Sequence, residues 1–359
     1  IQGWRRVIMN LTIVLNSIYS YLVNLRPEYD RSSRIAFTIG NISVMWYAII
    51  IMSGAIIGTL YGYYRFGKRL GLDSDTVLTG LALGLIFGII GARLYYVIFT
   101  ASANEIEYKS FLDVINPRDG GLAIHGALIA VAIYLPIFCK LNKIKLLTLL
   151  EIALPLILFA QVVGRWGNFV NQEAFGGLVK VPNLANYGEI TRYTVLDDAT
   201  LIAQREALSH MLIPNFVINR MYISYSNASG FLCAGYYYPT FYFESVLNLT
   251  GIVIYMIARK HIKKILVGDG ISFYLIWYGI VRFIVETMRT DPLYLGTTGI
   301  KVAELTSIIY IVLGITWLIV RRIKKIQMIS CWDALYKEGA NMRYDDYVMK
   351  PKKEKQNEQ

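Results

Sequence analysis

The sequence predicts an all-α polytopic membrane protein with seven transmembrane helices. Of its 359 residues, 55% are hydrophobic and 17% are charged, and the mean hydropathy is positive. Seven apolar runs reach or approach the roughly 17–25 residues that cross a bilayer as a helix. This pattern excludes a water-soluble protein with a buried core. The predicted spans are 42–64, 77–99, 121–141, 146–165, 239–258, 270–289 and 300–320.

The charges of the short loops predict the orientation of these spans. The loops after spans one, three, five and seven are rich in Lys and Arg, and the loops between them are poor. Basic loops stay in the cytoplasm. We therefore expect span one to start outside and the C-terminus to lie inside. The net charge of +11 then reports orientation and gives no reason to expect nucleic-acid binding.

The segments that flank and interrupt the spans have different characters. Residues 1–41 form an N-terminal arm, in which 7–25 has polar and apolar faces typical of an interfacial amphipathic helix. An eighth span and a signal peptide are the alternatives for that helix. Residues 177–238 form a long external loop within the membrane domain, 42–320. The charged and basic tail, 321–359, is expected to be cytoplasmic and, from about residue 326, solvated or disordered.

The cysteines and histidines give no sign of a metal or a cofactor. The three cysteines have neither a pairing pattern nor metal-ligand spacing, and the three histidines form no cluster. We expect no disulfide, no metal and no cofactor. These residues are Cys139, Cys233, Cys331, His125, His210 and His261.

Polar side chains from all seven spans fall near one membrane surface. Counted along each span at about 1.5 Å per residue, they lie within roughly 10 Å of the outer face. Ionisable groups at membrane depth persist mainly where they face a polar cavity. We therefore predict a polar cavity open to the outer leaflet. Glu151, near the inner end of span four, is an exception that interfacial solvation would explain. The residues of this set are Tyr47, Arg93, His125, Arg165, Glu244, Arg282, Glu286, Arg289 and Glu304.

The most specific pattern follows span four without a spacer. Residues 164–177 contain one arginine, two asparagines, one glutamate and four glycines. An arginine fork beside asparagine amides is suited to a phosphate, and glycines permit close backbone approach. The pattern predicts a site for an anionic, membrane-resident substrate.

This block resembles the signature of the prolipoprotein diacylglyceryl transferases, Gly-Arg-x-Gly-Asn-Phe-x-Asn-x-Glu-x-x-Gly. Every fixed position is filled, from Gly164 to Gly176. The similarity extends over about 37–322, including Trp46-Tyr47, the Gly91–Val97 segment, the histidine segment and the Tyr278–Arg289 stretch.

The resemblance implies an enzyme of the bacterial plasma membrane whose active site faces outward. It would move the diacylglyceryl group of phosphatidylglycerol onto the lipobox cysteine of a prolipoprotein signal peptide. The products would be a thioether and glycerol phosphate, and no nucleic acid would be a partner. The implied catalytic residues are His125, Arg165 and Arg282. The implied substrate-binding and cavity residues are Arg165, Asn168, Glu173, Gly176, Tyr47, Arg93, Glu244, Glu286 and Arg289.

Other readings of these residues remain open. Arg282 and Glu286, spaced i,i+4, can neutralise each other within one helix. His125 can be a structural histidine, and Tyr47 fits an aromatic belt at the membrane surface. A transporter or flippase for an anionic lipid or solute would also place polar groups among helices. The absence of visible half-repeats and the one-sided position of the polar groups speak against transport. A different lipid-headgroup transferase is a third possibility.

Overall fold

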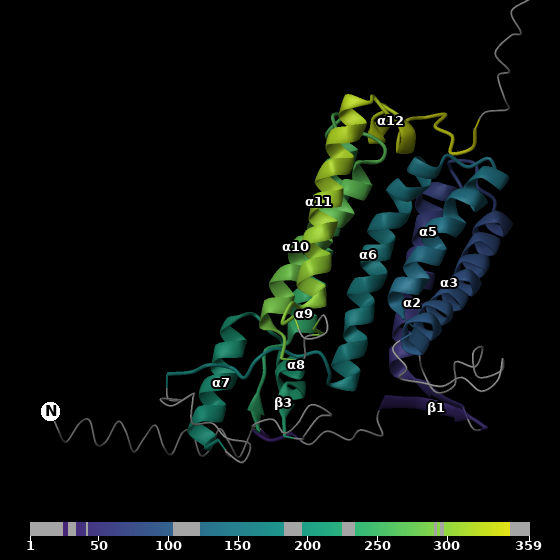
Figure 1. The fold of residues 1–359 in the computed structure, drawn as a ribbon. Coiled ribbons are helices and arrows are strands. Elements are labelled where there is room, and N and C mark those ends of the chain that lie inside the picture. Colours follow the sequence, from purple (N-terminus) through teal and green to yellow (C-terminus); the bar gives the residue numbers. More distant parts are fainter. Residues whose placement is uncertain are drawn as a thin grey trace, which may run out of the picture. The chain divides into compact units, whose positions relative to one another are not determined.

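The fold is described from a computed structural model (Figure 1), which covers residues 24–27, 34–40, 42–102, 123–182, 196–224, 234–290, 293–294 and 298–344. The predicted amphipathic helix at 7–25 lies outside this part except for its last two residues, as does Cys233. The chain divides into two compact units. Unit 1 comprises 1–58, 157–255 and 272–319, and unit 2 comprises 59–156, 256–271 and 320–359.

Long apolar helices form most of the described chain, which confirms a polytopic membrane protein. Six of the described helices are long and apolar enough to cross a membrane, and α5 is a shorter apolar helix. A π-helix, η2 (Tyr63–Gly67), continues α2. The helices are α2 (Trp46–Gly62), α3 (Ser74–Ser102), α5 (Ile124–Leu141), α6 (Leu146–Asn171), α9 (Thr240–His261), α10 (Asp269–Met288) and α11 (Val302–Ile323).

The described membrane spans are helical, as predicted, but two of the predicted span boundaries are wrong. Before span one, β1 (Ile35–Ile39) pairs antiparallel with β2 (Ile42–Met45). The strand takes the residues with which span one was expected to begin. Span four was expected to close at Arg165, but α6 continues to Asn171. The block of polar residues at 164–177 therefore begins inside a helix, where its spacing fixes which side chains share a face.

The described part of the long loop of unit 1, which is 177–182, 196–224 and 234–238, folds into a small packed layer. It contains α7 (Asp198–His210), α8 (Asn215–Arg220) and a short antiparallel pair, β3 (Tyr222–Ile223) with β4 (Gly235–Tyr236). Asp197 caps α7 by accepting a hydrogen bond from the backbone N–H of Thr200 at 2.9 Å. The apolar side chains of these elements form one buried core with the start of α9. This part of the chain is a structured domain, positioned at one end of the unit 1 helices.

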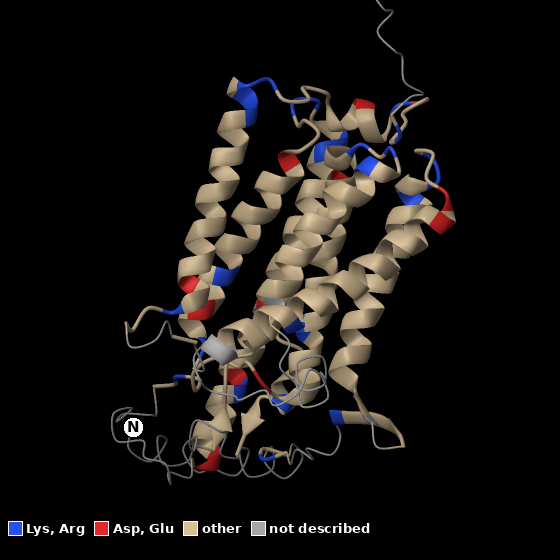
Figure 2. Ribbon diagram, turned by 45° about the vertical axis from the view of Figure 1, so that its right-hand side comes forward, with Lys and Arg blue, Asp and Glu red and all other residues tan. Residues whose placement is uncertain are grey.

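In unit 2, α3 and α5 pack at very close range. A Cβ atom built on Gly91 would lie 2.6 Å from the carbonyl oxygen of Gly126, and one built on Gly126 would lie 2.2 Å from that of Gly91. Only glycine allows two helix backbones to approach this closely, as in other small-residue helix contacts of membrane proteins. The basic loops also belong to unit 2, and Figure 2 shows their Lys and Arg residues gathered at one end of its helices.

Glu151 of α6 is buried in unit 2, and its expected solvation is wrong. Glu151 is 1% exposed, and its Oε1 accepts hydrogen bonds from the N–H groups of Gly268 at 2.6 Å and Gly270 at 2.7 Å. Arg259 donates to the backbone carbonyl of Glu151. Because α10 begins at Asp269, the carboxylate satisfies N–H groups that the first helical turn leaves free, and it complements the positive end of the helix dipole.

A second buried ionic group lies beside it in unit 2. Asp269 pairs with Arg321, which is fully buried, and with Arg322 at 2.7 Å. Arg321 also donates to the carbonyl oxygen of Val267. These contacts join the start of α10 to the end of α11 (Val302–Ile323) through charged groups, of which Arg321 is fully buried and Arg322 is partly exposed.

The first part of the C-terminal tail packs against unit 2, so the expectation of a solvated tail is wrong for residues 326–344. Backbone hydrogen bonds tie it to the loop before α10 and to Leu70, and α12 (Cys331–Leu335) carries fully buried side chains. Met342 is fully buried as well. Burial, together with the nearby carboxylate of Glu151, raises the pKa of the Cys331 thiol.

Candidate active site

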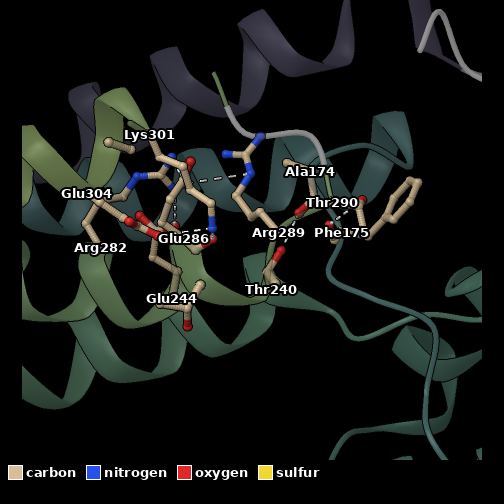
Figure 3. Close-up of polar contacts among 12 residues, drawn as sticks. Ala174, Phe175, Thr240, Glu244, Arg282, Glu286, Arg289, Thr290, Lys301 and Glu304 are labelled. Atoms are coloured by element: carbon tan, nitrogen blue, oxygen red, sulfur yellow. Dashed lines mark hydrogen bonds and ion pairs between the residues drawn. The ribbon is translucent and has the colours of Figure 1, made fainter. Parts of the chain in front are cut away.

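A ladder of alternating charges in unit 1 joins five of the predicted residues on three helices. Glu244 of α9 lies between two arginines: its Oε1 is 2.7 Å from NH2 of Arg165 on α6, and its Oε2 is 3.5 Å from NH1 of Arg282 on α10. NH2 of Arg282 also contacts Glu286 at 2.8 Å, and Nε of Arg289 lies 4.0 Å from the same carboxylate. Figure 3 shows the α9 and α10 members of the ladder pointing toward one another.

The ladder carries an excess of positive charge. Three guanidinium groups face two carboxylates, which leaves a net charge of +1. A neighbouring pair, Lys301 and Glu304 at 3.0 Å, adds none. The carboxylates are almost completely buried, whereas the arginine side chains are 15–22% exposed. The accessible edge of this buried network is therefore cationic, as a site for an anion requires.

The end of α6 brings the asparagines and the glutamate of the predicted motif together. Asn168 and Asn171 both donate their side-chain amides to Oε1 of Glu173, at 3.2 and 3.1 Å. The chain turns there because Gln172 and Ala174 adopt left-handed backbone angles, φ 51° and 54°. The turn directs Glu173 back toward the helix that carries Asn168. Two side-chain amides thus hold Glu173, which follows Arg165 of the ladder closely in the sequence.

Backbone hydrogen bonds join the segment after this turn to the residues just before α9 and to the end of α10. The N–H of Gly176 donates to the carbonyl of Tyr238 at 2.8 Å, and the N–H of Gly177 donates to that of Met288 at 3.0 Å. A Cβ atom on Gly176 would lie 2.9 Å from the Met288 oxygen, whereas one on Gly177 would meet nothing within 4 Å. Both N–H groups are occupied, so Gly176 contributes a close backbone crossing and not a free donor.

Two residues that the sequence did not single out secure the last turn of α6. Arg220 of α8 donates to the carbonyl oxygens of Phe169 at 3.2 Å and Val170 at 2.6 Å. Gln172 is 2% exposed, and its amide donates to the carbonyls of Arg220 and Tyr222 at 2.7 and 2.9 Å. A cation at the C-terminus of a helix satisfies free carbonyls and complements the helix dipole. The loop domain therefore holds the helix end that carries Arg165 and Asn168.

Aromatic residues complete the unit 1 site. Tyr47 of α2 packs so closely on Gly167 that a Cβ atom there would lie 2.3 Å from the Tyr47 ring. Tyr278, one turn before Arg282, interacts electrostatically with Glu244 and with two of the ladder arginines, Arg165 and Arg282. Tyr47 was a predicted site residue, and its contact explains why the motif has glycine between Trp166 and Asn168. The individual role of Tyr278 was missed, although the i,i+4 spacing to Arg282 was visible.

The remaining predicted site residues, Arg93 and His125, belong to unit 2. The guanidinium of Arg93 lies 5.7 Å from the ring centre of Tyr96. His125 is exposed near the start of α5, with its ring 6.0 Å from that of Tyr95. The close crossing of Gly91 and Gly126 brings these two segments of α3 and α5 to the same place.

The space among the unit 1 residues is narrow. About 150 Å³ lies between residues that include Arg165, Asn168, Glu244, Arg282 and Arg289, and no part of it is wide enough for a water molecule. The described residues contain no group of His, Cys, Asp and Glu that could hold a metal. A substrate headgroup would therefore have to shift side chains of the ladder in order to reach the arginines.

Comparisons with known proteins show the family of this chain. A model of the family "Prolipoprotein diacylglyceryl transferase" matches residues 34–320. Similar proteins include the phosphatidylglycerol–prolipoprotein diacylglyceryl transferase of Staphylococcus xylosus, 39% identical over 81% of this chain and 90% of the relative. Those of Bacillus cytotoxicus and Streptococcus agalactiae are each 38% identical and cover 82% and 80% of this chain, and 93% and 95% of their own lengths.

The matched region contains the whole charge ladder and the residues at the end of α6. The resemblance stated from residues 37–322 is thereby confirmed. This chain belongs to the prolipoprotein diacylglyceryl transferase family.

Proposed function

We propose that this enzyme transfers the diacylglyceryl group of phosphatidylglycerol to the lipobox cysteine of a prolipoprotein, the first step of lipoprotein maturation. The observation that carries the proposal is the ladder of Arg165, Glu244 and Arg282 at the ends of three membrane helices. Its surplus positive charge matches the single negative charge of a phosphate diester. Family membership supplies the same reaction.

In this reaction the cysteine sulfur attacks the glycerol carbon that bears the phosphate ester. The carbon–sulfur bond forms, the carbon–oxygen bond to phosphate breaks, and glycerol phosphate leaves with the bonding electrons. The thiol loses its proton, since the thiolate is the nucleophile. The leaving group gains negative charge in the transition state, and preorganised donors aimed at that charge lower the barrier.

Arg165 is the stronger candidate for holding the phosphate. It uses one terminal nitrogen on Glu244, which leaves other N–H donors of its planar fork for a ligand. Arg282 places both terminal nitrogens on carboxylates, so it also positions Glu244 and Glu286. We propose that Asn168, Glu173 and Tyr47 shape the headgroup site, that Arg289 extends it, and that Gly176 permits its closed geometry.

We propose that His125 accepts or orients the thiol proton and that Arg93, on the helix that packs against that of His125, is a substrate-binding residue. An arginine is a poor base because its pKa exceeds 12. Replacement of His125 by Asn keeps a hydrogen-bonding side chain but cannot accept the proton. It should lower kcat/KM and remove the limb of its pH profile that reports the base. An unchanged profile would exclude His125 as the base.

We further propose that the site opens toward the outer leaflet of a bacterial plasma membrane, with the N-terminus outside and the C-terminus in the cytoplasm. The support is the charge of the loops in unit 2 (Figure 2), since basic loops remain in the cytoplasm. An engineered Cys at Ala199 should react with an impermeant thiol reagent in intact cells. One at Lys337 should not. Labelling of the second position alone would reverse the orientation.

One reconstituted assay separates the candidate functions. Purified protein in vesicles receives phosphatidylglycerol labelled in its acyl chains and a peptide with a lipobox cysteine. Labelled thioether supports the proposal. Movement of labelled lipid between leaflets without a thioether would support a flippase, and transfer to a non-thiol acceptor would indicate another headgroup transferase.

A further inference from the structure

An apolar corner projects from the loop domain of unit 1. It is the turn between α7 and α8, where Met211 is 48% exposed, Leu212 is 85% exposed and Phe216 is 57% exposed. Neighbouring residues of the same turn are buried: Leu208 is 0% and Ile213 is 4% exposed. The buried residues of this turn thus anchor it to the core of the loop domain, while its large apolar side chains point outward.

The backbone of the corner makes this exposure more notable. Leu212 has φ 58°, in the left-handed region where glycine or asparagine is favoured over a bulky residue. Its N–H donates to the carbonyl of Ser209 at 3.0 Å, which closes the turn. A large apolar side chain at such a position costs conformational energy and, in water, hydration free energy as well. An apolar surrounding would offset the second cost.

Contacts with α6 and α9 place the corner level with the ends of membrane helices. The ring of Phe216 stacks on Trp166 of α6 with centroids 6.2 Å apart, and the hydroxyl of Tyr242 of α9 donates to the carbonyl of Leu212 at 3.2 Å. Trp166 lies five residues before the end of α6, a rise of about 7.5 Å. In Figure 1 the turn is at the upper end of α7, facing the helices.

Trp166 and Tyr242 are residue types that concentrate where the headgroups of a bilayer meet its acyl chains. The 26 residues of α6 extend about 39 Å, beyond the roughly 30 Å hydrocarbon core, so its last turns reach the interface. At that level, the acyl chains of the lipids are the apolar groups that can cover an apolar protein surface. An apolar surface directed at a bilayer is the usual arrangement of interfacial segments.

We propose that the α7–α8 corner inserts into the acyl-chain boundary of the leaflet at the C-terminal end of α6. The loop domain would then be held against the membrane by Met211, Leu212 and Phe216, in addition to its contacts with α6. This inference rests on the membrane helices and not on the proposed reaction.

Depth measurements on reconstituted full-length protein test the proposal. Leu212→Cys carries a nitroxide label in a background with Cys139, Cys233 and Cys331 replaced by alanine. Ala199→Cys, exposed near the other end of α7, is the matched control. In phosphatidylglycerol and phosphatidylcholine vesicles, relaxation of label 212 should respond several-fold more to oxygen than to a water-soluble nickel complex. Label 199 should show the reverse preference.

Equal nickel accessibility at the two labels would overturn the proposal. If label 212 loses nickel accessibility only when an apolar signal peptide is added, the corner is a peptide-docking surface and the lipid proposal is wrong. Met211→Cys gives a second reading at the same turn if the Leu212 variant does not fold. Folding is followed independently by gel filtration and thermal unfolding.

Discussion

Replacement of Arg165 by lysine separates a phosphate ligand from a simple counterion. Arg165 forms an ion pair with Glu244 at 2.7 Å, which uses one nitrogen of the guanidinium. A lysine ammonium can restore one such contact and keeps the net charge of the ladder at +1. What lysine cannot restore is the planar fork with further N–H donors.

The two interpretations predict different magnitudes. If the other donors of Arg165 hold the phosphate in the transition state, lysine removes at least one preorganised donor, which costs about 100- to 1,000-fold in kcat. If Arg165 only balances the charge of Glu244, the lysine ammonium keeps that charge, which limits the loss. The cost should then stay below about 1 kcal/mol, or roughly five-fold.

The measurement is turnover of a lipobox peptide by purified protein in phosphatidylglycerol vesicles, normalised to folded protein. The thermal unfolding midpoint of the lysine variant should remain near that of the original protein, because the ion pair with Glu244 is kept. Activity above one fifth of the original, with normal folding, would refute a phosphate-binding role for Arg165.

A double replacement, Arg282→Gln with Glu286→Gln, examines the neighbouring rung of the ladder in the same assay. The pair would be dispensable if it only neutralised itself within α10. The structure also places Arg282 3.5 Å from Glu244, so the double variant removes one of the two cations that hold that carboxylate. Loss of a hydrogen-bonded charge contact of this kind is expected to lower turnover about 10- to 100-fold. Near-normal turnover would exclude Arg282 from the site.

Three further outcomes follow from the described contacts. Gly176→Ala should lower the free energy of unfolding by about 1–3 kcal/mol, because the added Cβ would lie 2.9 Å from a backbone oxygen. Gly177→Ala should be tolerated, because its Cβ would meet nothing within 4 Å. Equal thermal unfolding of the two variants would contradict this expectation. Deletion of 345–359 should leave the unfolding temperature unchanged, while deletion of 326–344 as well should lower it, since that segment contains fully buried side chains. Cys331 should resist alkylation at pH 8 until the protein is denatured, because burial raises its thiol pKa and keeps the thiol protonated; mass spectrometry would detect early modification.

The sequence was sufficient for the membrane character, the family and most helix positions. Apolar runs of spanning length leave a helix as the main solution, because every backbone group must be satisfied within the segment. The block from Gly164 to Gly176 was specific enough to identify the family. The ionisable residues were also identifiable, because charged groups inside membrane helices need a reason to be there.

The sequence was less able to predict where elements end and which groups are paired. Span one lost its first residues to β2, which pairs with β1, and pairing between strands depends on a neighbour that local composition does not reveal. Glu151 was interpreted as solvated because its partners, the N–H groups of Gly268 and Gly270, are more than one hundred residues away in the chain.

Tertiary structure alone decided how the site residues are connected. Position along a helix gave the depth of Arg165, Glu244 and Arg282, but not that one carboxylate lies between the two arginines. Likewise, nothing local marks Arg220 as a cap for α6, since its partners are carbonyls of a helix fifty residues earlier. The helical period and the free-energy cost of burying charge determine which residues a membrane helix can carry and on which face. Packing between segments far apart in the sequence determines which of these residues come into contact.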